Sequence, residues 1–369
     1  MVGNQLNTVI EAVPEPMLHL DAAGLIVASN TAARGLLGDW IQGRSYAAVL
    51  RQPALLGRIE TVQADGNPGE ARFELADSAG STQFRVRITA LRGLSETPAG
   101  PRPDSARFPL LLHFTDITHL REAEEMRRDF VANVSHELRT PLTAVLGFIE
   151  TLRGPARNDE AARDRFLSIM EDEARRMNRL VSDLLSLSRV EAAERMRPSD
   201  LVDLRAVLDG TLAAMRPAAE LTGNTIVLHT EAVEAVSEQG QGEAPRNLIL
   251  GDRDQLMQVF LNLTENALKY GGPDRPVDLT LSREDGSGSM KGKVIRVDVT
   301  DHGDGIDPQH VPRLTERFYR IDTHRSRAMG GTGLGLAIVK HIVNRHRGRL
   351  RITSEKGRGS TFSVLFPEA

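Results

Sequence analysis

The middle of the chain carries two long segments whose apolar residues each fall on one face of a helix. No other feature constrains the fold as strongly. In residues 119–152 the apolar side chains recur at steps of three and four, and the same period returns after residue 159. The first stripe comprises Met126, Phe130, Val134, Leu138, Leu142, Val145, Ile149 and Leu152. The second comprises Phe166, Met170, Ala174, Met177, Val181 and Leu184. Such spacing predicts two amphipathic α-helices.

A break that starts at Gly154-Pro155 and runs through Asp159 separates the two predicted helices. Two long amphipathic helices joined by a short loop form an αα-hairpin. A hairpin of this kind cannot cover its own apolar faces, whereas two copies can cover them as a four-helix bundle. We therefore expect a homodimer through the helical hairpin.

The chain before the hairpin, residues 1–117, has the pattern of a small α+β domain. Segments 17–20 and 25–28 flank Asp21-Ala22-Ala23-Gly24, a hairpin signature with Gly at the turn, and Asn30 can cap the short helix after it. Alternating segments at 71–75, 83–91 and 110–114 predict three more strands, with a Pro- and Gly-rich loop at 96–105. Two strands, short helices and three antiparallel strands resemble a PAS sensor domain.

The chain after Pro198 is mixed again and predicts a second α/β domain. Helices are expected at 204–215, 252–270 and 334–346, and an acidic, polar linker at 233–245. Strands are expected at 225–229, 277–281, 294–299, 349–354 and 361–366. The predicted domains are therefore residues 1–117, residues 118–195 for the helical hairpin, and residues 200–369.

Composition excludes several classes of function. The net charge is −4, so there is no overall positive field for nucleic acid or an anionic membrane. The chain has no cysteine, which excludes disulfides, thiolate catalysis and cysteine metal sites. No apolar run approaches the roughly 20 residues of a membrane span, and the N-terminus does not have the pattern of a secretory signal. We expect a cytoplasmic protein that binds no nucleic acid, with any membrane association through a partner.

The first chemical motif is Ser135-His136-Glu137-Leu138-Arg139-Thr140-Pro141. Because Val134 and Leu138 belong to the apolar stripe, the imidazole of His136 between them should point to water. A solvent-facing histidine is usually an ordinary surface residue. Here Glu137 can hold or deprotonate an imidazole nitrogen. Pro141 removes a backbone hydrogen bond in mid-helix and should kink the helix one turn beyond His136. A zinc-protease motif fails because Thr140 stands where a second histidine is needed.

The second motif is an asparagine-containing helix. Asn262, Asn266, Lys269 and Tyr270 share one helical face by their spacing. Two amides and a lysine can hold a hydrated Mg²⁺ and phosphate oxygens. The alternative for this motif alone is a solvated helix face.

Glycine-rich loops follow. Asp301-His302-Gly303-Asp304-Gly305-Ile306 succeeds a strand, where Asp301 can accept a hydrogen bond from an exocyclic amine. The loop 330–336, with the sequence GGTGLGL, opens a helix whose N-terminal N–H groups suit phosphate. The alternative for each is an ordinary turn. Neither loop is a Walker A or a GxGxxG motif.

The order of these motifs is more specific than any one of them. A SHELRTP-type box, an asparagine box, DxGxGI, Glu316-Arg317-Phe318-Tyr319-Arg320 and the GGTGLGL loop follow one another. Together they resemble the sensor histidine kinases of two-component systems over residues 121–367. The stretch RQPALL at 51–56 in the PAS-like region is similar to the phosphate-regulon sensor kinases. The implied fold class is multidomain α+β, with a PAS-like sensor, a dimerising two-helix hairpin and an α/β sandwich ATP-binding domain of the GHKL type.

The resemblance implies an enzyme that uses ATP and Mg²⁺ to phosphorylate His136, passes the phosphoryl group to a response-regulator aspartate, and acts as a phosphatase toward that regulator. Glu137 resembles the general base, Thr140 the residue that aligns water for dephosphorylation, and Asn266 the Mg²⁺ ligand. Asp301 resembles the adenine-reading carboxylate. The implied nucleotide-binding residues are Asn262, Lys269, Tyr270, Asp301, Gly303, Gly305, Arg317, Arg320, Gly331, Thr332, Gly333, Leu334 and Gly335.

Two other functions are weighed against this one. The first is an ATPase or serine kinase on the same ATP-binding fold, which would not need Ser135-His136-Glu137 on a dimer helix. The second is a non-enzymatic dimeric scaffold that carries a degenerate kinase, which predicts loss of Asn266, Asp301 or the loop glycines. All of these residues are present.

Overall fold

The computed structural model describes residues 2–77, 80–92, 107–193, 196–230, 247–286, 290, 292–321 and 331–369. The expected loop at 96–105 and the expected linker at 233–245 therefore lie outside the described residues. The chain divides into two compact units, Met1–Ala132 and Asn133–Ala369. No helix in the described part of the chain is long and apolar enough to cross a bilayer.

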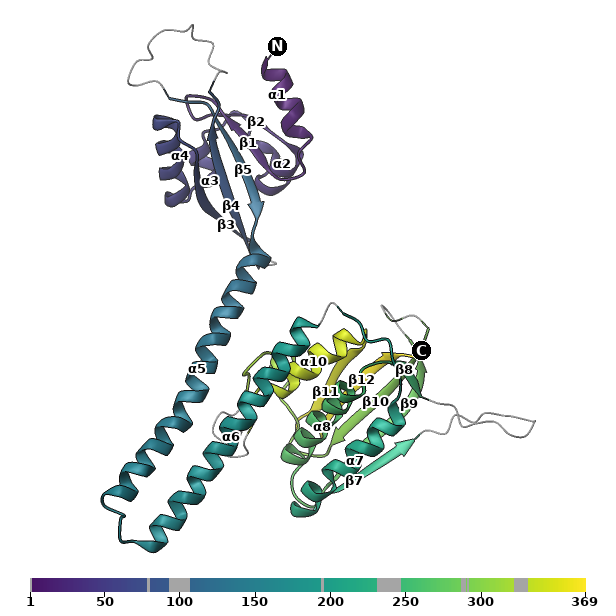
Figure 1. The fold of residues 1–369 in the computed structure, drawn as a ribbon. Coiled ribbons are helices and arrows are strands. Elements are labelled where there is room, and N and C mark those ends of the chain that lie inside the picture. The colour runs from purple at the N-terminus through teal and green to yellow at the C-terminus, as the bar shows by residue number, and fades with distance from the viewer. Residues whose placement is uncertain are drawn as a thin grey trace, which may run out of the picture. The chain divides into compact units, whose positions relative to one another are not determined.

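The first unit is a five-stranded antiparallel sheet with helices (Figure 1). Its helices are α1 (Val2–Glu11), α2 (Thr31–Leu37), η1 (Asp39–Ile41), α3 (Tyr46–Leu50) and α4 (Pro53–Asp65). Its strands are β1 (Met17–Leu20), β2 (Ile26–Ser29), β3 (Gly69–Asp77), β4 (Gly80–Ala90) and β5 (Leu110–Asp116), in the order β2-β1-β5-β4-β3. The five strands confirm the sequence prediction, whereas α1 was not predicted. Phe73, Phe84 and Phe114 pack against one another in the core.

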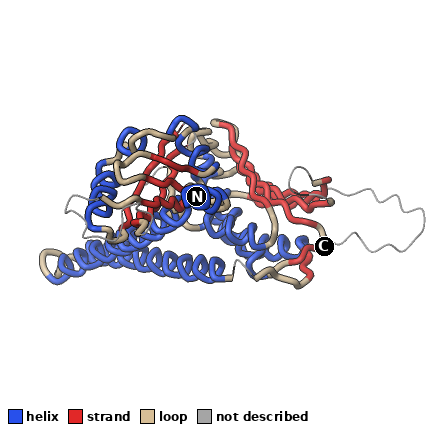
Figure 2. The backbone as a smooth tube through the Cα atoms, turned by 90° about the horizontal axis from the view of Figure 1, so that it is seen from above, coloured by secondary structure: helices blue, strands red, loops and turns tan. Residues whose placement is uncertain are grey.

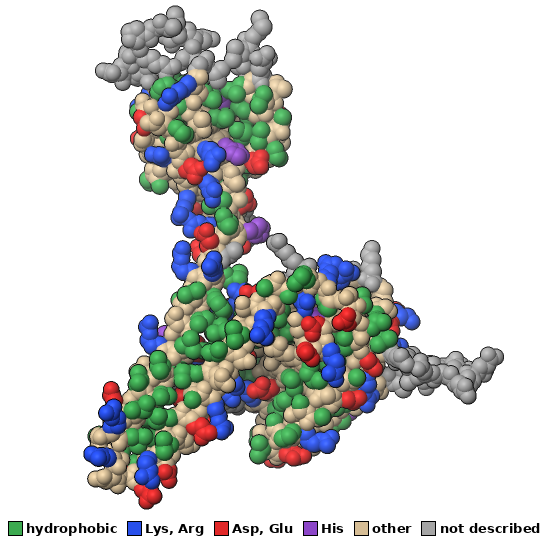
Figure 3. All heavy atoms as spheres, in the orientation of Figure 1, with side chains coloured by type: hydrophobic (Ala, Val, Ile, Leu, Met, Phe, Trp, Pro, Cys, Tyr) green, Lys and Arg blue, Asp and Glu red, His purple; other side chains and the backbone are tan. Residues whose placement is uncertain are grey.

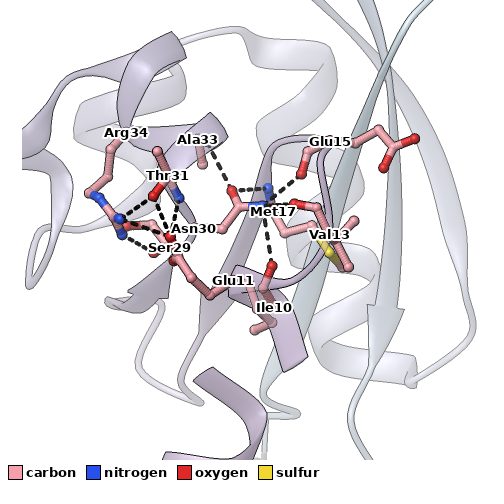
Figure 4. A network of polar contacts seen from close by, with 10 residues as sticks. All are labelled: Ile10, Glu11, Val13, Glu15, Met17, Ser29, Asn30, Thr31, Ala33 and Arg34. Atoms are coloured by element: carbon pink, nitrogen blue, oxygen red, sulfur yellow. Dashed lines mark hydrogen bonds and ion pairs between the residues drawn. The ribbon is translucent and has the colours of Figure 1, made fainter. Parts of the chain in front are cut away.

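Asn30 is the polar centre of this unit (Figure 4). Its Oδ1 accepts hydrogen bonds from the backbone N–H groups of Ala33 (2.9 Å) and Met17 (3.0 Å), so it caps α2 as predicted and also holds the start of β1. Its Nδ2 contacts three backbone carbonyl oxygens, those of Ile10 (3.3 Å), Val13 (2.9 Å) and Glu15 (2.7 Å). One buried amide thus ties the segment after α1 to the sheet.

The second unit begins within a helical hairpin. Helices α5 (Thr118–Arg153) and α6 (Glu160–Ala192) run side by side (Figures 1 and 2), and Phe148 of α5 stacks on Phe166 of α6. Asp159 caps α6 through the N–H of Ala162. Helix α5 continues without a break through Pro141, so this proline does not end it.

The rest of the second unit is a layer of helices on a mixed five-stranded sheet. Its helices are α7 (Leu204–Leu221), α8 (Arg253–Tyr270), η2 (Val311–Arg313) and α10 (Gly335–Arg345). The sheet has the order β11-β12-β10-β9-β7, formed by β7 (Thr225–Thr230), β9 (Pro276–Asp285), β10 (Lys293–Asp301), β11 (Arg349–Glu355) and β12 (Gly359–Pro367). Only the β7–β9 pair among these is parallel. These elements match the predicted ones, except that α7 extends beyond residue 215, β9 extends beyond residue 281, and η2 was not predicted.

A second small sheet was not predicted. Strands β6 (Leu201–Asp203) and β8 (Leu248–Leu250) pair antiparallel. Each has three residues, which is too short for an alternating pattern to be recognised in the sequence.

Replacing Asn30 with Ala should destabilise the first unit by about 3 kcal/mol, because the change leaves several backbone groups at this site without a partner. The single tryptophan, Trp40, lies in this unit, so urea unfolding followed by tryptophan fluorescence reports on it. Asn67→Ala, at an exposed position, is the matched control. Equal unfolding midpoints for the two variants would show that the Asn30 amide contributes little.

Candidate functional site

His136 lies on α5 with its side chain exposed, as the spacing predicts. One turn further on, the Thr140 hydroxyl donates a hydrogen bond to the His136 carbonyl at 3.1 Å. Thr143 and Thr151 on the same helix bond back in the same way, at 2.9 and 2.8 Å. The Thr140 contact is therefore the usual one for a threonine inside this helix.

Glu137 is held between two guanidinium groups. Its Oε2 accepts from Arg176 of α6 at 3.0 Å and from Arg320 at 3.2 Å. All three side chains are largely buried, with exposures of 14, 12 and 6%. Charge-assisted hydrogen bonds of this kind are stronger than neutral ones. Glu137 thus joins α5 to the chain segment before the glycine loop.

Helix α8 presents the predicted polar face because its other face is buried. Val259, Leu263 and Ala267 pack inward, which leaves Asn262, Asn266 and Lys269 half-buried on the other side. Asn262 donates to the carbonyl of Gly335 at 3.3 Å, and Lys269 pairs with Glu265 at 2.6 Å. Tyr270, the last residue of α8, is exposed.

Asp301 lies at the end of β10 and is 4% exposed. Burial raises the pKa of its carboxyl, and hydrogen bonds from the Gly303 N–H and from Ser360 act in the opposite direction. A side chain at Gly303 would clash with the Tyr270 carbonyl, and one at Gly359 would clash with the Asp301 carbonyl. These glycines therefore let three backbone segments meet at the carboxyl.

The glycine loop leads directly into α10. Gly330 lies outside the described residues, whereas Gly331, Thr332, Gly333, Leu334 and Gly335 are described. Gly333 has φ +74°, and a side chain there would press on the backbone of Phe318. Leu334 is fully buried and anchors the loop in the core. Gly305 also has a positive φ, and a side chain there would clash with the Glu355 carbonyl.

The loop side of this site contacts α6 directly. The Thr332 hydroxyl donates to Asp183 at 2.6 Å, and Arg317 pairs with Glu191 at 2.6 Å. Burial raises the pKa of the Asp183 carboxyl, while the Thr332 hydrogen bond opposes the rise. The space enclosed by Glu137, Arg320, Thr332 and neighbouring α6 side chains is about 10 Å³, room for about one water.

Sequence reasoning missed the residues of α6 that make these contacts. Arg176, Asp183 and Glu191 were not named as candidates. Leu180, Leu187 and Val190 are buried and form a second apolar face on α6 beside the predicted stripe. An apolar helix wider than one stripe was the available signal for a second packing partner.

His346 fixes the two site helices to each other. Its Nδ1 bonds to the Ile342 carbonyl at 2.7 Å, so this nitrogen carries the proton, and its Nε2 accepts from the N–H of Asp252 at 2.9 Å. Asp252 caps α8, and His346 ends α10. The bond that Nε2 accepts requires the neutral ring, because both nitrogens of a protonated ring are donors. Burial lowers the pKa of His346 from its ordinary 6.5.

This pKa shift predicts a pH dependence of stability. As the pH falls through 6.5, the unfolded chain binds a proton at His346 before the folded chain does, so the free energy of unfolding falls as the pH decreases. In His346→Gln this contribution is absent, and the loss of stability between about pH 7.5 and about pH 5.5 should be smaller. Urea unfolding followed by circular dichroism measures it. His119→Gln, at an exposed position, is the control and should retain the wild-type dependence.

Comparisons with known proteins agree with this geometry. The family model described as "Histidine kinase-, DNA gyrase B-, and HSP90-like ATPase" matches residues 251–369, and the "His Kinase A (phospho-acceptor) domain" matches residues 126–193. The first model covers α8, Asp301 and the glycine loop, and the second covers the helical hairpin.

Curated relatives match over most of the chain. The phosphate regulon sensor protein PhoR of Pseudomonas aeruginosa is 38% identical over 73% of this chain and 59% of its own length. The sensor-like histidine kinase SenX3 of Mycolicibacterium smegmatis is 37% identical over 72% of this chain and 63% of its own. The sensor protein kinase WalK of Staphylococcus aureus is 35% identical over 68% and 56%. The chain thus spans about three fifths of the length of these relatives. The two family models match successive parts of the chain, and these relatives are similar to it over most of its length. The chain therefore belongs to the sensor histidine kinases.

Proposed function

We propose that this chain is a protein-histidine kinase that uses ATP to phosphorylate His136 and then transfers the phosphoryl group to an aspartate of a response regulator. The observation that carries the proposal is the contact of Glu137 with Arg320. It joins the residue beside His136 to the arginine that precedes the glycine loop. The contact places the acceptor helix beside the arginine that leads to the proposed nucleotide site, so that little movement separates this arrangement from one in which Arg320 binds the nucleotide. Phosphoryl transfer depends mainly on such positioning and on charge stabilisation.

In the proposed reaction an imidazole nitrogen of His136 attacks the γ-phosphorus. The P–N bond forms as the bond from the γ-phosphorus to the bridging oxygen breaks, and ADP leaves. Glu137 takes the imidazole proton, while Arg317 and Arg320 neutralise charge on the transferring group. In the second step the P–N bond breaks as a regulator carboxylate takes the phosphoryl group, which regenerates His136.

The nucleotide is assigned to the face of α8, Asp301 and the glycine loop. Asp301, buried at the end of β10, reads the adenine amine, and the loop before α10 faces the phosphates. Among the described residues no cluster of three or more His, Asp or Glu side chains could hold a metal alone. The half-buried amide of Asn266 fits a Mg²⁺ ion whose other ligands are phosphate oxygens and water. That ion would neutralise triphosphate charge.

The homodimer is proposed on the exposed apolar face of the hairpin. Leu142 and Leu146 of α5 and Leu185 of α6 are 50, 53 and 55% exposed, and apolar side chains follow the hairpin in Figure 3. A second copy would cover this face as a four-helix bundle. The sheet and helices of the first unit support a PAS-like sensor within the proposed bounds 1–117, 118–195 and 200–369. Cytoplasmic location and a role in phosphate-regulon signalling stay predictions.

His136→Gln should abolish incorporation of the γ-phosphate of ATP as an acid-labile, base-stable phosphoramidate, while nucleotide binding persists. Gln keeps a polar side chain but has no nucleophilic ring nitrogen. Labelling with γ-³²P-ATP, followed by acid and base treatment, measures it, and chelation of Mg²⁺ should also stop labelling. His119→Gln on the same helix is the control. Labelling that survives in His136→Gln would remove the phosphoacceptor assignment.

Thr140→Ala should preserve autophosphorylation but slow dephosphorylation of the regulator severalfold or more. The hydroxyl is proposed to orient water toward the regulator phosphoaspartate, and Ala is the better helix former. Thr143→Ala removes an equivalent back-bonded hydroxyl and is the matched control, with both activities unchanged. Equal loss of both activities in Thr140→Ala would indicate a structural role, and no loss of either would mean that Thr140 is only a surface residue.

A further inference from the structure

Three carboxylates of the helical hairpin bind arginine and threonine side chains that the proposed function assigns to the nucleotide. Glu137 binds Arg320, Asp183 binds Thr332, and Glu191 binds Arg317. The distances are 3.2, 2.6 and 2.6 Å in that order. We call Glu137, Asp183 and Glu191 the docking carboxylates.

The contact is a packed interface. Leu180, Leu187 and Val190 of α6 are between 1 and 4% exposed, and α6 packs along α10. Ser186 and Gln258 of α8 exchange hydrogen bonds at 3.0 and 2.8 Å. The guanidinium of Arg345 in α10 donates to the carbonyls of Ala193 and Met196. The cavity beside Glu137, Arg320 and Thr332 has a volume of about 10 Å³, which holds about one water molecule.

A carboxylate and a phosphate group present similar oxygen acceptors to the same donors. Arginine guanidinium groups bind both, and a hydroxyl at the start of a helix can donate to either. Thr332 also lies two residues before Leu334, whose N–H contacts its hydroxyl at 3.3 Å. The Asp183 carboxylate is thus seated at the N-terminal end of α10.

We propose that the docking carboxylates act as an internal competitor of the triphosphate, so that docking of α6 on the glycine-loop side and binding of ATP exclude each other. This inference rests on the proposed nucleotide site. Docking then lowers ATP affinity, and by reciprocity ATP weakens docking by the same factor. Any event that separates α6 from α10 releases Thr332, Arg317 and Arg320 together for the phosphates.

Neutralising the two carboxylates of α6 tests the competition. Asp183→Asn and Glu191→Gln preserve side-chain size but weaken the contacts with Thr332 and Arg317. In the full chain, the double variant should bind a non-hydrolysable ATP analogue about tenfold more tightly by calorimetry, a typical coupling factor between linked sites. Asp172→Asn, an exposed acid on the same helix, should bind like the wild type.

A variant that keeps the negative charge distinguishes loss of the charge from a structural effect of the substitution. Asp183→Glu retains the carboxylate and should retain the weak binding, whereas Asp183→Asn should lower the KM for ATP without lowering kcat. Equal or weaker affinity in the double variant, or tight binding in Asp183→Glu as well, would overturn the competition. Absence of analogue binding by every variant and by the wild type would instead refute the proposed nucleotide site. Circular dichroism confirms that each variant is folded.

Discussion

The second unit depends on the packing of α8 on the sheet and against α10. One face of α8 is buried in the core. The direction of its polar face, which carries Asn262 and Asn266, is therefore fixed. The neutral imidazole of His346 joins the end of α10 to the cap of α8. Because α10 begins at the glycine loop, the same packing sets the distance between the loop and the asparagine face. The geometry of the proposed nucleotide site is therefore a consequence of how two helices lie on one sheet.

Charge then connects this layer to the hairpin. Glu137 lies between Arg176 of α6 and Arg320, so the carboxylate beside His136 contacts both parts that would cooperate in the proposed phosphoryl transfer. In this arrangement Glu137 binds Arg320, which the proposed reaction would need at the transferring phosphoryl group. Removing a buried partner from such a set is costly, so the contacts should change together. In the resting arrangement the arginine and threonine donors would bind carboxylates of the hairpin, and in the nucleotide-bound arrangement the same donors would bind phosphate groups.

The sequence predicted the elements whose signals are local. The three- and four-residue period in α5 and α6, the turn before Gly24 and the cap at Asn30 all appear in the structure. The polar face of α8 follows from helical spacing. The contacts of Arg320 with Glu137 and of Thr332 with Asp183 join residues far apart in the chain, and no local pattern encodes such pairs. Leu180, Leu187 and Val190 were missed because their face adjoins the predicted stripe.

The competition between hairpin and nucleotide can be measured without changing any charged group. The chain has no cysteine, so Ser186→Cys and Gln258→Cys create a unique pair across the interface of α6 and α8. A short bifunctional maleimide reagent would then hold the two helices together. The account predicts that the cross-linked protein binds a non-hydrolysable ATP analogue about tenfold more weakly than the same double variant before cross-linking. Equal affinity before and after cross-linking would contradict it.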